Sequence, residues 1–229
     1  MNPEATITML QFADGLFPAG AYAHSFGLET YVARGIVSHA GDVEQLLRAH
    51  LQGSAGPTDA VAIVSALRAT SLKDLDQCLE LDSLIDAMKP ALELRNASRQ
   101  MGRQTARIAD ALVEHPILRE FARLASADIT PCHHSVVFGI AGGAQGWPPF
   151  EAAAAYLYSS TAAIVGAALR LIPLGQLKGQ LIIRNLTPLI GTLANEATAK
   201  GVHEIAGFVP ALEIASMRHA AMDARLFRS

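Results

Sequence analysis

Apolar residues recur at helical spacing along most of this chain. Residues 43–51, 81–88 and 182–193 each carry Leu, Ile, Val or Met at steps of three or four positions. On a helix such residues share one face, so each segment predicts an amphipathic helix facing a common core. The β-prone triplets 136–138 and 181–183 are too short and isolated to indicate a sheet. The pattern predicts an all-α fold, a single-domain bundle of about nine or ten helices over residues 1–229.

Glycine and proline mark the expected helix ends. Prolines suited to the first turn of a helix stand at Pro57, Pro90, Pro116 and Pro149. Glycine-rich stretches predict loops at Gly53–Gly56, Gly142–Pro149 and Gly201–Pro210. Pro188 lies inside an apolar helical pattern, so that helix is expected to kink there or to be two helices.

Composition narrows the function classes. Hydrophobic residues make up 51% and charged residues 17% of the chain, which indicates a large core and apolar surface for partners. The net charge of −3 gives no general attraction to nucleic acid. Cys78 and Cys132 are far apart in the sequence and do not suggest a disulfide framework, and the N-terminus lacks a secretory pattern. We therefore expect a cytoplasmic protein. Residues 152–169 are uncharged, but their Ala, Ser, Thr and Gly content favours a buried helix over a membrane span.

Catalytic and metal-binding patterns are weak. The glycines of 139–146 and of 175–180 lack the Gly-x4-Gly-Lys-Ser/Thr order of a phosphate loop, so close helix packing or turns explain them better. Cys132, His133 and His134 are adjacent, and neighbouring residues do not readily converge on one ion. We therefore expect no catalytic residue, cofactor or stable metal site. The alternative is a helical metal-dependent enzyme that uses these three residues.

Arginines repeat every four residues at Arg95, Arg99, Arg103 and Arg107. On a helix they form a stripe that slowly circles the axis. Such a stripe suits ion pairs with neighbouring helices or with a partner, and a solvated face is the alternative.

The chain ends in Arg225, Leu226, Phe227, Arg228 and Ser229, an unusual combination of bulky apolar and basic residues for a terminus. Either the apolar pair folds back on the core, or residues 217–229 form a tail that inserts into a partner's pocket. On the second interpretation, removal of the last five residues leaves the fold intact and abolishes partner binding.

Three separated blocks resemble one family. LQ-x-x-D-x-x-x-P-x-G-x-Y-x-H-S-x-G-L-E-T-Y-V at Leu10–Val32 is similar to the N-terminal signature of the urease accessory protein UreF. PLGQLKGQ at Pro173–Gln180 and the terminal SMRH…RLFRS at Ser216–Ser229 resemble two further elements of that family. Weaker matches are Arg95-x-x-Ser98-x-x-x-Gly102 and Phe138-Gly139. The joint match spans nearly the whole chain in the expected order.

The resemblance implies an all-α, non-catalytic homodimer that joins UreD (also called UreH) and the GTPase UreG, engages apo-urease and assists nickel insertion. A variant of this role is that the protein regulates the GTPase directly. Arg103, Arg107 or Arg225 would then be candidate arginine fingers. Partner contacts are expected in the three blocks, at Pro18, Gly20, Tyr22, His24, Ser25, Gly27 and Glu29, at Gly175, Gln176 and Lys178, and at Arg225, Leu226, Phe227, Arg228 and Ser229.

Overall fold

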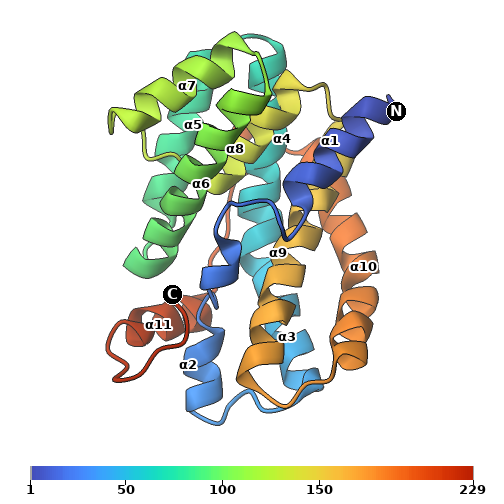
Figure 1. Cartoon of the computed structure of the whole chain (residues 1–229), viewed down its shortest axis with the longest axis vertical. Helices are drawn as coiled ribbons and strands as arrows, with labels where there is room; N and C mark the ends of the chain where they lie inside the picture. The colour runs from blue at the N-terminus through green and yellow to red at the C-terminus, as the bar shows by residue number, and fades with distance from the viewer. Residues whose placement is uncertain (1, 229) are drawn as a thin grey trace.

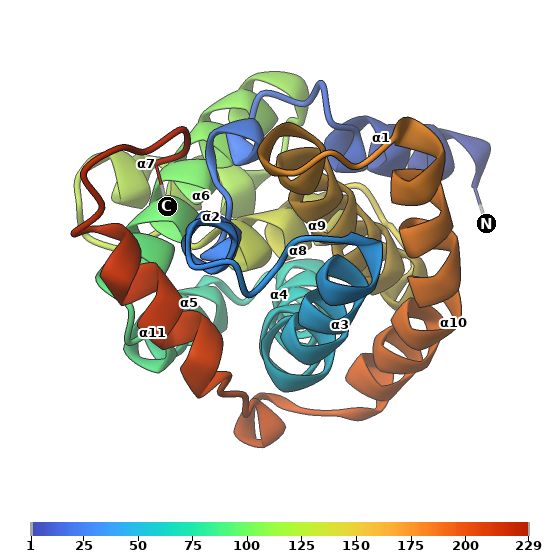
Figure 2. The same ribbon diagram turned by 90° about the horizontal axis from the view of Figure 1, so that it is seen from below.

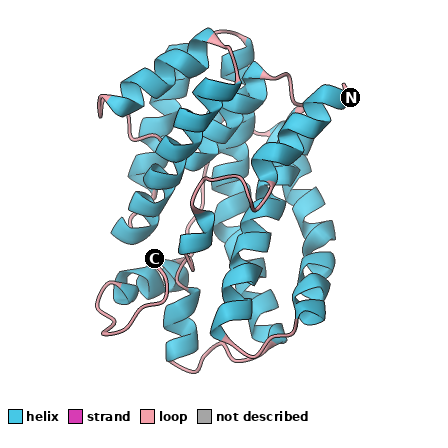
Figure 3. Ribbon diagram, viewed as in Figure 1, coloured by secondary structure: helices cyan, strands magenta, loops and turns pink. Residues whose placement is uncertain are grey.

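A computed structural model describes residues 2–228, and in this part of the chain every regular element is helical, as Figure 3 shows. The α-helices are α1 (Pro3–Ala13), α2 (Leu28–Ala33), α3 (Ala40–His50), α4 (Val61–Ser71), α5 (Leu75–Met88), α6 (Leu92–Leu112), α7 (Pro116–Ser126), α8 (His134–Ala144), α9 (Pro149–Leu171), α10 (Gln176–Ala199) and α11 (Pro210–His219). A π-helical segment, η2 (Leu51–Ala60), joins α3 to α4 without a break, and η1 (Ala21–Ala23) and η3 (Val202–Glu204) are short 3-10 turns. The predicted all-α class is confirmed.

Local sequence explains several helix starts. The side chain of Asn2 accepts a hydrogen bond from the Glu4 N–H at 3.1 Å, and Asp74 accepts one from the Gln77 N–H at 2.9 Å. Both satisfy backbone donors that a first helical turn leaves unpaired. Pro116 is the first residue of α7, as predicted, whereas Pro90 lies just before α6.

The predicted break at Gly53–Pro57 is wrong. Gly53–Gly56 is not a loop and Pro57 does not open a helix, because both lie inside η2. A Cβ on Gly56 would lie 2.9 Å from a methyl group of Leu193 on α10, so this glycine allows a close helix contact instead of a turn. α10 also runs as one helix through Pro188, whose side chain is exposed. The missing proline N–H removes one internal bond, and the buried stripe Ile182–Leu193 holds both halves against the core.

Two hydrophobic clusters meet at the central helix α4. The first gathers side chains of α1, α4, α5, α6, α7 and α8 around Trp147, and the second those of α2, α3, η2, α4, α9 and α10 around Leu157. α4 supplies Ile63 and Leu67 to the first cluster and Val61 to the second. Figures 1 and 2 show α4 between the α5–α8 end of the molecule and the α3, α9 and α10 end.

Glycines of α8 bring it against α4. A Cβ on Gly139 would lie 2.5 Å from the Ile63 carbonyl oxygen, and one on Gly143 would lie 2.5 Å from the Leu67 oxygen. No side chain fits such a gap, so the two backbones touch along one turn. The close-packing interpretation of this glycine-rich stretch is confirmed.

By length and composition α9 is apolar enough to cross a membrane. It packs against α10, α4 and α1 inside the protein, and residues such as Leu157, Ile164 and Ala168 are buried there. Core helices of soluble proteins have the same properties, and α9 takes such a place here.

Candidate functional site

The N-terminal signature forms a turn, η1 and the start of α2. Gly20 and Gly27 adopt φ angles of +92° and +85°, which favour glycine. A Cβ on Gly27 would lie 3.4 Å from the Leu212 carbonyl oxygen and 3.5 Å from the Ala215 Cβ, so α11 packs closely on this point. α2 begins at Leu28, and Ser25 Oγ accepts the Glu29 N–H at 3.4 Å. Its neighbour Thr30 donates to the Ala215 carbonyl oxygen at 2.9 Å.

The C-terminal segment returns to this same place. After α11 the chain turns, and the N–H groups of Leu226 and Phe227 donate to the Glu29 carboxylate at 2.6 and 3.1 Å. The Arg228 N–H donates to the Ala23 carbonyl oxygen at 2.8 Å. Figures 1 and 2 show the chain end lying beside α2 and α6. The first and last family-like blocks therefore form one surface.

A buried histidine ties three elements together there. His219 Nε2 lies 2.8 Å from Glu29 Oε2, and its Nδ1 lies 2.9 Å from Glu93 Oε2 on α6. Each ring nitrogen therefore lies within hydrogen-bond distance of a carboxyl group, one on α2 and one on α6. The guanidinium of Arg225 also pairs with Glu93, at 3.2 Å from its Oε1.

The electrostatics favour an ionised Glu29. Burial alone would raise the pKa of this carboxyl, but the hydrogen bonds from His219, Leu226 and Phe227 outweigh it and the pKa lies below its usual value. Burial lowers the pKa of the nearby His24 to about 4, and the Arg228 guanidinium adds to this shift. His24 is therefore neutral at pH 7.

An arginine of α9 links the tail to the signature. The Arg170 guanidinium carbon lies 3.7 Å from the centre of the Tyr22 ring and 4.1 Å from that of Phe227. Its NH2 group also donates to the Tyr22 carbonyl oxygen at 2.8 Å. Phe227 is buried in the second hydrophobic cluster, whereas Tyr22 and Leu226 are 73% and 63% exposed. The tail therefore combines both alternatives, with one side chain in the core and its neighbour facing outward.

An open groove of about 900 Å³ begins beside this contact. It is lined by residues of α6, of α7, of the segment before α2 and by Arg228. Its lining includes seven of the residues expected from the sequence or belonging to their segments: Pro18, Gly20, His24, Arg99, Arg103, Arg107 and Arg228.

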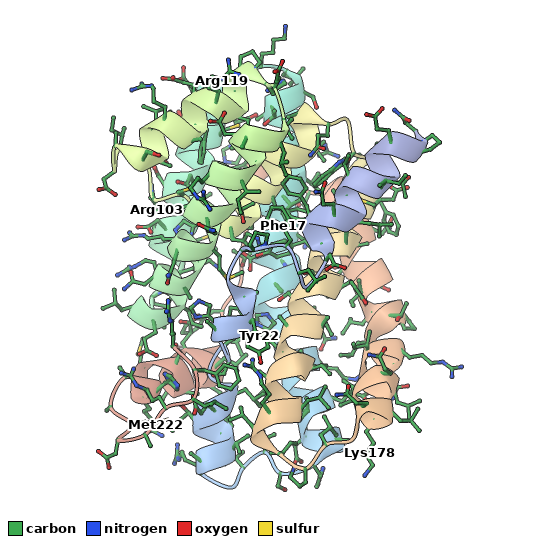
Figure 4. The ribbon with its side chains drawn as sticks, viewed as in Figure 1. Phe17, Tyr22, Arg103, Arg119, Lys178 and Met222 are labelled. Carbon is green, nitrogen blue, oxygen red and sulfur yellow. The ribbon has the colours of Figure 1, made fainter. Side chains whose placement is uncertain are left out.

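The other expected residues lie in several places. Tyr22, Ser25, Gly27, Glu29, Arg225, Leu226 and Phe227 build the tail contact just described. Gly175, Gln176 and Lys178 surround the start of α10 and line none of this surface, and Figure 4 shows Lys178 and Arg103 in different regions. Arg95 lies on α6 but not in the groove, with its Nε buried. Ser229 lies outside the described residues.

Phe17, Tyr22 and Phe26 do not form the aromatic cluster that their proximity in sequence suggests. Phe17 stacks on Phe12 at 4.6 Å between ring centres, and Tyr22 packs under Arg170. Figure 4 shows Phe17 and Tyr22 at different levels of the molecule.

The geometry does not support the metal-site alternative. His133 uses both ring nitrogens, at 3.0 Å from Ser98 Oγ and 2.9 Å from Asp86 Oδ1. Burial raises the pKa of the Cys132 thiol, which disfavours the thiolate that binds metals. Within residues 2–228 no group of three His, Cys, Asp or Glu side chains is placed to hold an ion. These residues instead start α8, where the N–H groups of Cys132 and His133 donate to the buried Asp82 carboxylate.

Sequence reasoning missed three residues of the tail contact. His219 lies within a family-like block, and Glu93 has no local signal in the sequence. Arg170 is the first charge after the uncharged run 152–169, and a charge at the end of a buried helix could have marked it.

Comparison with known proteins identifies the family of the chain. The family model of UreF matches residues 37–187. A urease accessory protein UreF from Nostoc sp. is 34% identical over 96% of this chain and 94% of its own length. Proteins of the same name from Corynebacterium efficiens and Bacillus sp. are 32% and 29% identical, over 98% and 97% of this chain and 96% and 98% of their own lengths. The chain belongs to the UreF family of urease accessory proteins.

Proposed function

We propose that this protein is a cytoplasmic scaffold that joins UreD (UreH) and UreG, engages apo-urease and promotes nickel insertion. UreF proteins are non-catalytic accessory proteins with a role in urease maturation, and they work with partners of the urease accessory system. The particular partners and a homodimeric state rest on the family resemblance, and the cytoplasmic location rests on the two separated cysteines and the N-terminal sequence.

One observation carries the proposal. Two family-like blocks about 200 residues apart in sequence form a single surface at α2, α11 and the tail. Tyr22 and Leu226 are exposed there, although their neighbours are held in place by buried contacts. Rigid placement of exposed apolar side chains is typical of binding surfaces.

A pull-down tests the scaffold. The full chain, co-expressed with tagged UreD and with UreG, should be retained on the tag, and Leu226→Asp should reduce the retained amount. Leu72→Asp is the matched control, because Leu72 is 78% exposed and follows α4, away from this surface. Equal retention of both variants and the unchanged chain would contradict the placement of the binding surface. If neither partner retains the unchanged chain, the proposal that this protein is a scaffold is refuted.

Regulation of the UreG GTPase is a second candidate role. Arg103 and Arg225 are engaged by Asp128 and Glu93, whereas Arg107 contacts only the Gln104 amide oxygen among the described residues, at 3.4 Å. Arg107 is thus the arginine that is most free to enter a partner's site. GTP hydrolysis by UreG should change when this protein is added and return toward the basal rate with Arg107→Ala. No change of rate on addition of the protein would exclude this role.

A further inference from the structure

We propose that the groove between α6 and α7 binds an acidic segment of a partner protein. This inference deepens the proposed function and rests on it, since it names the chemistry that the scaffold recognises. The groove and the exposed tail residues are neighbouring parts of one surface, joined at Arg228.

The charge of the groove is opposite to that of the whole chain. The chain carries a net charge of −3, yet the groove is lined by four arginines and, among residues 2–228, by Asp128 as its single carboxylate. Guanidinium groups prefer carboxylates because their donors match both oxygens at once. A basic groove on an acidic protein selects an anionic occupant.

The arginines are not all equally available. Arg99 is held by two bonds of 2.7 and 2.8 Å to the Asp86 carboxylate, which His133 also contacts. Arg103 pairs with Asp128 at 2.8 Å, but both side chains are largely exposed, at 45% and 76%. Exposed pairs of this kind contribute little, so an incoming carboxylate can replace Asp128. Arg107 forms no ion pair with any residue in the described range 2–228.

The spacing of the cations defines the occupant further. Arg99, Arg103 and Arg107 are four residues apart on α6, which places successive arginines about 6 Å apart along the axis. In an extended peptide alternate side chains lie about 6.6 Å apart on one face. A segment with Glu or Asp at alternate positions can therefore meet successive arginines.

The floor of the groove admits a peptide backbone. Three small residues form it, with Ala106, Ala122 and Ala125 at 2%, 9% and 2% exposure. Where these short side chains line the groove, a bound chain can lie close to the helices. The backbone turn at Pro18 and Gly20 closes one side.

A binding assay with the full chain tests this. The probe is a fluorescein-labelled peptide of alternating Glu and Gly, followed by fluorescence anisotropy. The chain should bind it, with affinity falling as salt rises. Arg103→Glu combined with Arg107→Glu should weaken binding by at least about tenfold, since like charges across an interface repel. Arg119→Glu combined with Arg123→Glu on α7 makes the same charge change outside the groove lining, and should leave binding within about twofold. Figure 4 shows Arg119 well away from Arg103.

Three results would overturn the proposal: equal binding by both double variants, no binding by the unchanged chain, or tighter binding of an oligothymidine of equal charge. The last outcome would assign the groove to nucleic acid. Circular dichroism of each variant confirms that it is folded. Retention by UreD and UreG is measured in parallel. If the unchanged chain does not bind the peptide but is retained normally, the groove proposal alone is refuted. If the unchanged chain is not retained, the proposed function is refuted.

Discussion

Replacing Glu29 by glutamine keeps the shape of the side chain and removes its charge at the point where the tail is held. The carboxylate accepts the Leu226 and Phe227 N–H groups and the His219 ring N–H, at 2.6, 3.1 and 2.8 Å. Hydrogen bonds to a charged group contribute roughly 1.5–3 kcal/mol each. The glutamine amide keeps one accepting oxygen, and its NH2 group would face N–H groups that themselves donate. We therefore expect docking of the tail to weaken by about 2–4 kcal/mol.

Hydrogen–deuterium exchange at residues 226–228 measures this directly. Since about 1.4 kcal/mol corresponds to a tenfold change in an equilibrium, protection of these amides should fall by about 30-fold or more. Glu204→Gln is the control, because Glu204 accepts one exposed bond from the Gly201 N–H at 3.0 Å. Protection of Leu226 within about threefold of the unchanged chain would refute the assigned role of Glu29.

The remaining predictions concern acid stability and packing. Folding lowers the pKa of Glu29 below 4.5, so its stabilising effect is present above that pH and is lost as the pH falls through the folded value. The free energies of unfolding in urea of the unchanged chain and of Glu29→Gln should therefore converge below pH 4.5. A difference that stays constant with pH would contradict this. Phe227→Ala should lower the free energy of unfolding by about 3 kcal/mol, because a buried ring is removed from the core. Phe208→Ala, at a 61% exposed position, should lower the melting temperature much less than Phe227→Ala does. Gly143→Ala should cost about 1–3 kcal/mol by pushing α8 from α4, whereas Gly166→Ala, with no atom within 4 Å of the new Cβ, should be neutral or slightly stabilising in the same melts.

The tail contact also changes one expectation from the sequence. Removal of residues 225–229 was expected to leave the fold intact, but the structure places Phe227 in the core and two tail amides on Glu29. Truncation therefore disturbs α2 and α11 as well as any partner contact. A point change at the exposed Leu226 separates the two effects better.

Periodicity was sufficient for the helices because burial of one face is a local property of the sequence. The stripe from Ile182 to Leu193 predicts α10 correctly, since the same side chains are buried in the structure. Gly53–Pro57 was misread because glycine and proline are local signals for breaks, and here contacts with α10 and residues 208–209 outweigh them.

The candidate site was only partly accessible to the same reasoning. The spacing of Arg99, Arg103 and Arg107 predicts a stripe, and the family-like blocks indicate both chain ends. Nothing in the sequence indicates that Glu93 meets His219, because their separation of 126 residues is closed only by the packing of α11 on α6. Contacts of this kind depend on the whole fold.

The sharing of α4 by the two hydrophobic clusters has a thermodynamic consequence. Loss of order in either cluster would expose one side of α4 and strip packing from the other, so the two halves are expected to melt together. A partner that binds only the tail surface would then raise the free energy of unfolding of the entire chain through mass action. In the cell, such coupling would lengthen the lifetime of this protein whenever its binding partners are abundant.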